Sequence, residues 1–224
     1  MEYNQVATQQ PSATDIDLRH RVLRNTYALL SMSMVPTVIG ALTSTMLGIS
    51  TLVSLIFFGI AFCLMFAVQK YKDSGLGVVL LLTFTLFMGL TLGPLLNYAL
   101  RFSNGGSLIA VAAGGTGVIF ITLAGIAATS KRDFSKMGSF LFAGLVLILV
   151  ASIANIFLNM PGLALAISAV AVFVFSALIL FDINRIIQGG ETNYVTATLS
   201  VYLDIFNIFV NLLQLLLAFA GDRR

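Results

Sequence analysis

The sequence predicts an all-α, polytopic membrane protein folded as a bundle of seven transmembrane helices. Hydrophobic residues make up 58% of its 224 residues and charged residues only 9%, and the mean hydropathy is +1.00. A soluble chain has about a quarter of its residues charged, because its surface must be polar. The apolar residues also form runs of about 20, the length with which a helix crosses a bilayer. The lipid bilayer is therefore the expected surrounding of most of the chain.

Two parts are expected along the chain. The tail over residues 1–20 is rich in Gln, Thr and Ser and buries too little apolar area to offset chain entropy, so we expect disorder. It lacks the apolar core of a cleavable signal peptide, and it is either an inert leader or a handle for a cytoplasmic partner. Residues 21–224 form one transmembrane domain, whose short connections make consecutive helices antiparallel neighbours. Its expected spans are 26–48, 51–68, 75–100, 107–129, 138–158, 163–183 and 194–220.

The basic residues between the spans predict the orientation. Cytoplasmic loops of membrane proteins carry an excess of Lys and Arg. With the N-terminus in the cytoplasm, that side holds nine of the twelve basic residues, and seven spans place the C-terminus outside. A re-entrant last segment would return Arg223 and Arg224 to the cytoplasm, and the sequence leaves this alternative open. The nine expected cytoplasmic residues are Arg19, Arg21, Arg24, Lys70, Lys72, Lys131, Arg132, Lys136 and Arg185.

The third span contains the packing motif GLTLGP. Gly89 and Gly93 are four residues apart, a spacing that lets two helix backbones approach closely. Pro94 removes a backbone donor and should kink the helix near Leu90, and Asn97 is placed one turn on to satisfy a freed carbonyl. The fourth span contains a second small-residue segment, AAGGTG, over 112–117. We expect both segments to pack inside the bundle, with a homodimer seam as the alternative.

The last span carries a polar stripe on one face. At about 100° per residue its members fall within an arc of about 80° and extend over about 27 Å, nearly the thickness of the hydrocarbon core. Such a face cannot point at lipid, because an ionised carboxylate costs several kcal/mol there. It is either a helix-packing face with a protonated aspartate or the wall of an ion or proton pathway. The stripe consists of Thr196, Ser200, Asp204, Asn207, Asn211 and Gln214.

Asp182, near the end of the sixth span, is the expected partner of Asp204. Two carboxyl groups in contact share one proton. The protonated pair would close as a hydrogen bond, and the ionised pair would separate or transiently bind a hard cation such as Ca²⁺. Contact requires that the linker over 188–193 lets the last helix begin higher on the cytoplasmic side, since the depths otherwise differ by roughly 9 Å. Gly189 and Gly190 permit such a linker, and Thr192 or Asn193 is placed to cap the helix.

Composition and motifs argue against several other functions. The net charge of +3 is weak and the basic residues form no single patch, so nucleic acid is not expected. One histidine, His20, and one cysteine, Cys63, are too few for a metal site. The motifs HExxH and GxSxG are absent, and the two acids read FD and YLD, unlike the YD and GxGD motifs of intramembrane aspartyl proteases. We expect neither an enzyme nor a resident cofactor.

The C-terminal part also resembles a known family. The segment ILFDINRIIQGGETNYVTATLSVYLDIFNIFVNLL is similar to the terminal signature of the Bax-inhibitor family of membrane proteins. The segments VLRNTY, LGPLLN, ANIFL and LAISAV resemble the bacterial YccA branch of that family. The likeness covers nearly all of the chain beyond residue 20.

The resemblance implies a fold, a place and two functions. It implies a seven-helix bundle in the bacterial inner membrane, with the last helix enclosed by the others. In ion-conducting members an aspartate in each of the last two spans forms a pH-sensitive pair linked to calcium leak, and Asp182 and Asp204 match those positions. Some of these members also have an arginine in the second span, which this sequence lacks. The YccA branch implies binding to the membrane-anchored AAA protease FtsH, which would grasp the tail over residues 1–20 and be held in check.

Overall fold

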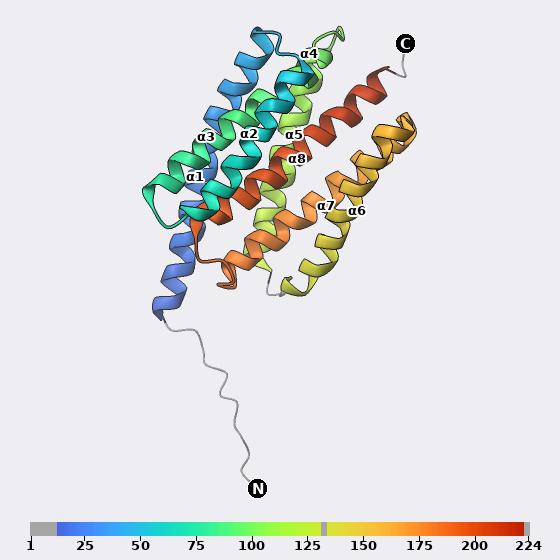
Figure 1. Ribbon diagram of the computed structural model, residues 1–224. Coiled ribbons are helices and arrows are strands. Elements are labelled where there is room, and N and C mark those ends of the chain that lie inside the picture. The colour runs from blue at the N-terminus through green and yellow to red at the C-terminus, as the bar shows by residue number, and fades with distance from the viewer. Residues whose placement is uncertain (1–12, 131–133, 222–224) are drawn as a thin grey trace.

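The computed structural model describes residues 13–130 and 134–221, and these form a bundle of helices (Figure 1). Within these ranges no strand occurs, and seven helical segments are long and apolar enough to cross a membrane. The predicted fold class is thereby confirmed. The helices are α1 Ala13–Met46, α2 Thr51–Lys70, α3 Gly75–Thr91, α4 Gly93–Ala99, α5 Gly105–Thr129, the short 3-10 helix η1 Ser135–Met137, α6 Gly138–Leu158, α7 Pro161–Ile187 and α8 Tyr194–Gly221.

Helix α1 begins well before the predicted first span. It starts at Ala13, so residues 13–20, which we expected to be disordered, are helical. The sequence supports this start, because Asp17 stands four residues before Arg21, a spacing that stabilises a helix when the charges are opposite. Residues 1–12 of the expected tail lie outside the described residues. The first turns of α1 project beyond the rest of the bundle (Figure 1).

The third span is broken where proline predicts a kink. Helix α3 ends at Thr91 and α4 begins at Gly93, and the two together form one span. Pro94 has no N–H to donate to the carbonyl of Leu90, one turn earlier. The hydroxyl group of Ser44 donates to this carbonyl at 2.7 Å. The prediction that Asn97 satisfies it is wrong, because the partner comes from α1, which packs beside the kink.

Small residues bring α1 and α3 into close backbone contact, as the GLTLGP motif of the third span predicts. A Cβ atom on Gly89 would collide with the backbone of Thr37, and one on Gly93 would collide with the side chain of Ser44. Gly40 on α1 makes the same kind of approach to the backbone of α3 at Leu86. The AAGGTG segment packs inside the bundle at Ala112 and Thr116, which are buried. The packing prediction is wrong at Gly114, where a Cβ atom would meet nothing within 4 Å.

Helix α8 lies at the centre of the bundle. It packs against α7, α1 and α5, and it also touches α2 and α3, so the helix predicted to be enclosed is central (Figure 1). It is one continuous helix of 28 residues, and it ends at the opposite end of the bundle from the start of α1. The alternative of a re-entrant last segment is therefore wrong. Helix α6 is peripheral and packs against α7.

Candidate functional site

The candidate site lies between α7 and α8, and the loop that joins them sets its geometry. Helix α7 ends with backbone hydrogen bonds from Gly189 to the carbonyl of Ile186 at 3.0 Å and from Gly190 to that of Arg185 at 2.9 Å. Gly189 has a φ of 79°, a conformation that favours glycine after a helix. The guanidinium group of Arg19 lies against Gly189 and donates to the carbonyl of Ile187 at 3.4 Å. A cation at this end also suits the negative pole of the helix dipole.

Asn193 fixes the start of α8. Its Oδ1 accepts the backbone N–H groups of Val195 at 2.9 Å and Thr196 at 3.1 Å, which is the bonding of a helix N-cap. Its Nδ2 donates to the carbonyl of Lys72 at 3.1 Å and to the carboxylate of Asp73 at 2.8 Å, in the turn between α2 and α3. The predicted capping role of Asn193 is confirmed, and the same side chain ties α8 to a neighbouring turn.

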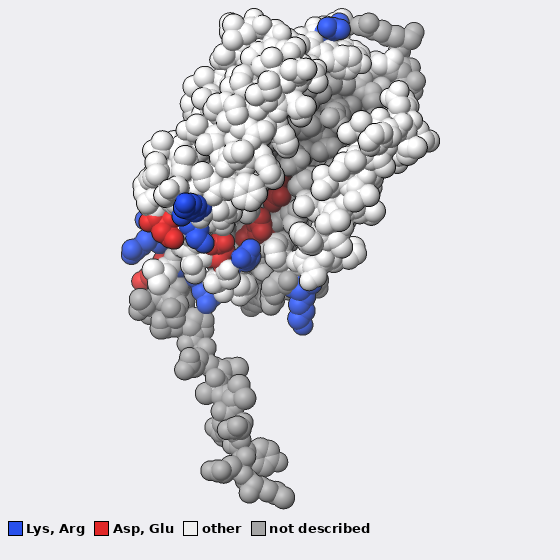
Figure 2. Space-filling model, in the orientation of Figure 1, with Lys and Arg blue, Asp and Glu red and all other residues white. Residues whose placement is uncertain are grey.

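The structure brings the two predicted acids together. The carboxyl groups of Asp182 and Asp204 lie within reach of a mutual hydrogen bond. Asp182 is half-buried and Asp204 is 5% exposed, and its Oδ2 accepts no hydrogen bond from the described residues. Figure 2 shows acidic atoms that run from the end of the bundle rich in Lys and Arg into a hollow of the surface. Asp204 is thus buried in the span, and Asp182 lies less than two turns before α7 ends at Ile187.

Two further charges belong to this site, and the sequence interpretation missed them. Arg185 and Glu191 lie close enough to act electrostatically on Asp182. Arg185 also approaches Glu191, with Nη2 and Oε2 3.8 Å apart, and its Nε donates to the carbonyl of Gly190 at 3.3 Å. The sequence does carry a signal for Arg185, which follows Asp182 by three residues and so shares its face of α7. Glu191 comes close only through the fold of the loop.

This arrangement can hold and release a proton more readily than it can hold a metal ion. Two carboxyl groups in contact share one proton, and loss of that proton leaves like charges in a poorly solvated place. Calcium takes six to eight oxygen ligands, of which this pair supplies at most a few. Among the described residues, no three His, Cys, Asp or Glu side chains gather as metal ligands would. The pair therefore suits a transient cation rather than a resident one.

The other members of the polar stripe have different partners. Gln214 accepts a hydrogen bond from Ser168 on α7 at 3.0 Å. Asn207 and Asn211 donate to carbonyls of their own helix, each at 2.8 Å. Thr196 has a buried hydroxyl without a partner among the described residues, and Ser200 is half-buried. The stripe thus contacts α7 through Asp204 and Gln214.

Helix α8 is held by an anchor that the sequence interpretation did not identify. Tyr202 is 1% exposed, and its hydroxyl lies 2.8 Å from that of Thr37 on α1. It also donates to the carbonyl of Thr85 on α3 at 3.5 Å. Tyr202 precedes Asp204 by two positions on the same helix, so this anchor fixes the height of the acid within the bundle. A tyrosine in an apolar helix gives no sequence signal for these partners.

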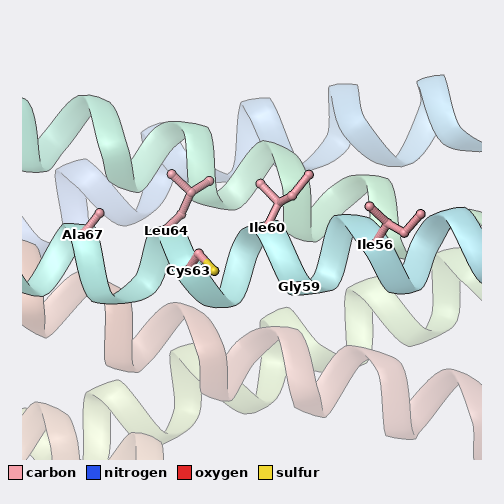
Figure 3. Close-up of a pocket in the computed structure, with 6 residues that line it drawn as sticks. All are labelled: Ile56, Gly59, Ile60, Cys63, Leu64 and Ala67. Carbon is pink, nitrogen blue, oxygen red and sulfur yellow. The ribbon is translucent and has the colours of Figure 1, made fainter.

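The outer face of α2 offers a shallow depression but no site chemistry. It is lined by α2 alone, and Figure 3 shows its six residues along one stretch of that helix. Cys63 is exposed there rather than packed inside the bundle. Apart from Cys63 the lining is aliphatic or glycine, which suits contact with lipid.

Comparisons with known proteins give a consistent result. The family described as "Inhibitor of apoptosis-promoting Bax1" matches residues 19–221. An "Uncharacterized membrane protein" of Vibrio cholerae is 46% identical over 88% of this chain and 89% of its own. The "Modulator of FtsH protease YccA" of Escherichia coli is 39% identical over 95% of this chain and 97% of its own. An uncharacterized protein of Pseudomonas aeruginosa is 40% identical over 90% of each chain.

Proposed function

Because this chain belongs to the Bax-inhibitor family of membrane proteins, we propose that it binds the membrane-anchored AAA protease FtsH and holds its activity in check. The observation that carries the proposal is the similarity to the E. coli modulator of FtsH, which extends over nearly the whole of both chains. The YccA protein of a second E. coli strain is described as an inner membrane protein, which supports a place in the inner membrane for this chain. The proposed function is non-enzymatic, in keeping with the description of the E. coli relative as a modulator.

The segment over residues 1–12, which precedes α1, is the proposed point of engagement. The first turns of α1 stand clear of the bundle (Figure 1), and Asp17, Leu18 and His20 are exposed. This end of the bundle also carries most of the Lys and Arg side chains in Figure 2, which supports a cytoplasmic position. A protease that pulls on a cytoplasmic segment would reach the chain here. Residues 1–12 would be the first that it meets.

Co-purification with FtsH tests this engagement. Deletion of residues 1–12 removes the segment before α1 and keeps Arg19, whose guanidinium group holds the end of α7. The truncated chain should lose most FtsH from the purified complex, whereas a full-length Asp17→Asn variant should keep it. Equal recovery of FtsH with the truncated chain would count against engagement through the tail. Loss with both variants would place the contact in α1 itself.

The contact between Asp182 and Asp204 favours a second function, a pH-dependent leak of calcium or another cation. A shared proton closes the pair by a hydrogen bond, and its loss as the pH rises leaves two carboxylates that repel each other. Repulsion would separate α7 from α8 at this pair. Arg185 and Glu191 at the same end would modulate this response. Cation flux should therefore increase with pH.

Calcium flux into liposomes between pH 5 and 8 tests the second function. Flux through the unmodified chain should rise across this range, and Asp204→Asn should abolish the rise because an amide cannot ionise. Asp17→Asn makes the same chemical change at an exposed position and should leave the flux unaltered. Equal flux in the unmodified chain and Asp204→Asn would remove the pathway. FtsH binding is measured separately, so either function can fail alone.

A further inference from the structure

An apolar groove opens on the side of the bundle between α1 and α5. It has a volume of about 480 Å³, and α8 forms its floor. Its walls include Leu30, Val38 and Leu42 of α1, Ala113 and Phe120 of α5 and Phe209 of α8. From Leu30 to Leu42 the groove follows α1 for about 18 Å, more than half of a hydrocarbon core of about 30 Å. Neither acid of the α7–α8 site lines it.

The polar atoms in the groove already have partners. Ser31 donates to the carbonyl of Tyr27 at 2.9 Å, and Thr116 donates to that of Ala112 at 2.7 Å. The hydroxyl groups of Thr37 and Tyr202 bond to each other at 2.8 Å. Among the described residues, none of those that line the groove is charged. Water would find few hydrogen bonds here, so an apolar occupant is favoured.

The groove continues the surface that faces lipid. Val38 and Leu42 at its rim are 55% and 58% exposed on a helix that crosses the membrane. Arg24, also exposed, precedes Ser31 by seven residues and therefore lies on the same face of α1. It stands about 10 Å nearer the N-terminal end, where lipid headgroups begin. The surface thus offers an apolar channel below a cation, which is complementary to a phospholipid.

The cation beside the groove favours a phospholipid over a partner helix as the occupant. A lipid phosphate complements the charge of Arg24, whereas an apolar helix offers no anion to it. We propose that the groove binds one acyl chain of a phospholipid in the leaflet on the N-terminal side, with its phosphate at Arg24. The chain lies along Phe209 and against the pair of Tyr202 and Thr37.

A single tryptophan can report the occupant, because the sequence contains none. Phe209→Trp places it on the groove floor. Phe84→Trp is the shielded control, since Phe84 is 2% exposed, and Phe157→Trp on α6 is the open control, at 84% exposure. Each variant is purified in detergent and titrated with phosphatidylglycerol brominated on its acyl chains, which quenches tryptophan on contact. Quenching of Phe209→Trp should saturate near one lipid per protein, whereas Phe157→Trp should require bulk lipid.

Two second-site changes make the test specific. Gly117→Leu adds a side chain to the groove, where a Cβ atom meets nothing within 4 Å, and should reduce quenching of Phe209→Trp to that of Phe84→Trp. Arg24→Gln should raise the half-saturating lipid concentration at least three-fold. Quenching of Phe209→Trp no stronger than that of Phe84→Trp, or rising only with bulk lipid, would overturn the proposal. If a second copy of the chain closed the groove instead, quenching of Phe209→Trp would be no stronger than that of Phe84→Trp, and crosslinking would give dimers.

Discussion

At Leu90, one side-chain hydroxyl replaces the backbone hydrogen bond that Pro94 cannot make. Ser44 supplies it from a different helix, at 2.7 Å. The kink follows from the sequence, because proline lacks an N–H wherever it stands. The identity of the partner does not follow, because Ser44 reaches Leu90 only after α1 has packed against α3 and α4. The hydrogen bond between Tyr202 and Thr37 is likewise unpredictable, because it also forms only after the helices have packed. The pairing of Asp182 with Asp204 was predictable, because buried acids require a polar partner.

Ser44→Ala should destabilise the fold by about 1–3 kcal/mol, the cost of leaving a partly buried carbonyl without a partner. Ser31→Ala is the matched control, because Ser31 is exposed and bonds only to its own helix at 2.9 Å. Thermal unfolding in detergent, followed by circular dichroism, compares the two variants. Equal melting temperatures would show that the Ser44 hydroxyl does not stabilise the kink.

Among the elements, α1 and α3 depend on a backbone contact that admits no Cβ atom. Gly89→Ala should force the helices apart and cost about 1–3 kcal/mol, as overpacking does. Gly114→Ala faces open space on α5 and should be neutral or slightly stabilising, because alanine favours a helix. If the contact is this close, Gly89→Ala should melt at a lower temperature than Gly114→Ala. A smaller loss for Gly89→Ala than for Gly114→Ala would contradict it.

The start of α8 depends on Asn193 alone among the candidate caps. Asn193→Ala removes two N-cap bonds and two bonds to the α2–α3 turn, and we expect a loss of at least about 1 kcal/mol. Thr192→Ala is the control, because Thr192 is exposed and precedes the cap. Hydrogen exchange of the amides of Val195 and Thr196 should accelerate in Asn193→Ala. Unchanged exchange would mean that the cap does not hold this end.

Element boundaries show where sequence patterns are sufficient. The spans of α2, α5 and α6 end within about two residues of the predicted positions, because hydropathy falls sharply there. The start of α1 was missed by 13 residues, since charged pairs at helical spacing extend the helix beyond the apolar run. The open face at Gly114 was missed as well, because small residues permit close packing without requiring it.

For the whole molecule, composition was enough to predict the membrane class and the seven-helix bundle. The family resemblance predicted the central place of α8. Neither composition nor the resemblance predicted the positions of the loops. Orientation remains a prediction that labelling can test. In a Cys63→Ala background, Arg101→Cys should react with a membrane-impermeant maleimide in intact cells, and Lys72→Cys should react only after lysis. The reverse pattern would invert the proposed topology.

The most direct test of the proposed function uses FtsH and a separate membrane-protein substrate reconstituted in liposomes. The rate of substrate degradation is measured with increasing amounts of this chain, and with the variant that lacks residues 1–12. We predict that the full chain slows degradation in proportion to its amount and that the shortened chain loses most of this effect. A degradation rate unchanged at excess full chain would contradict the account.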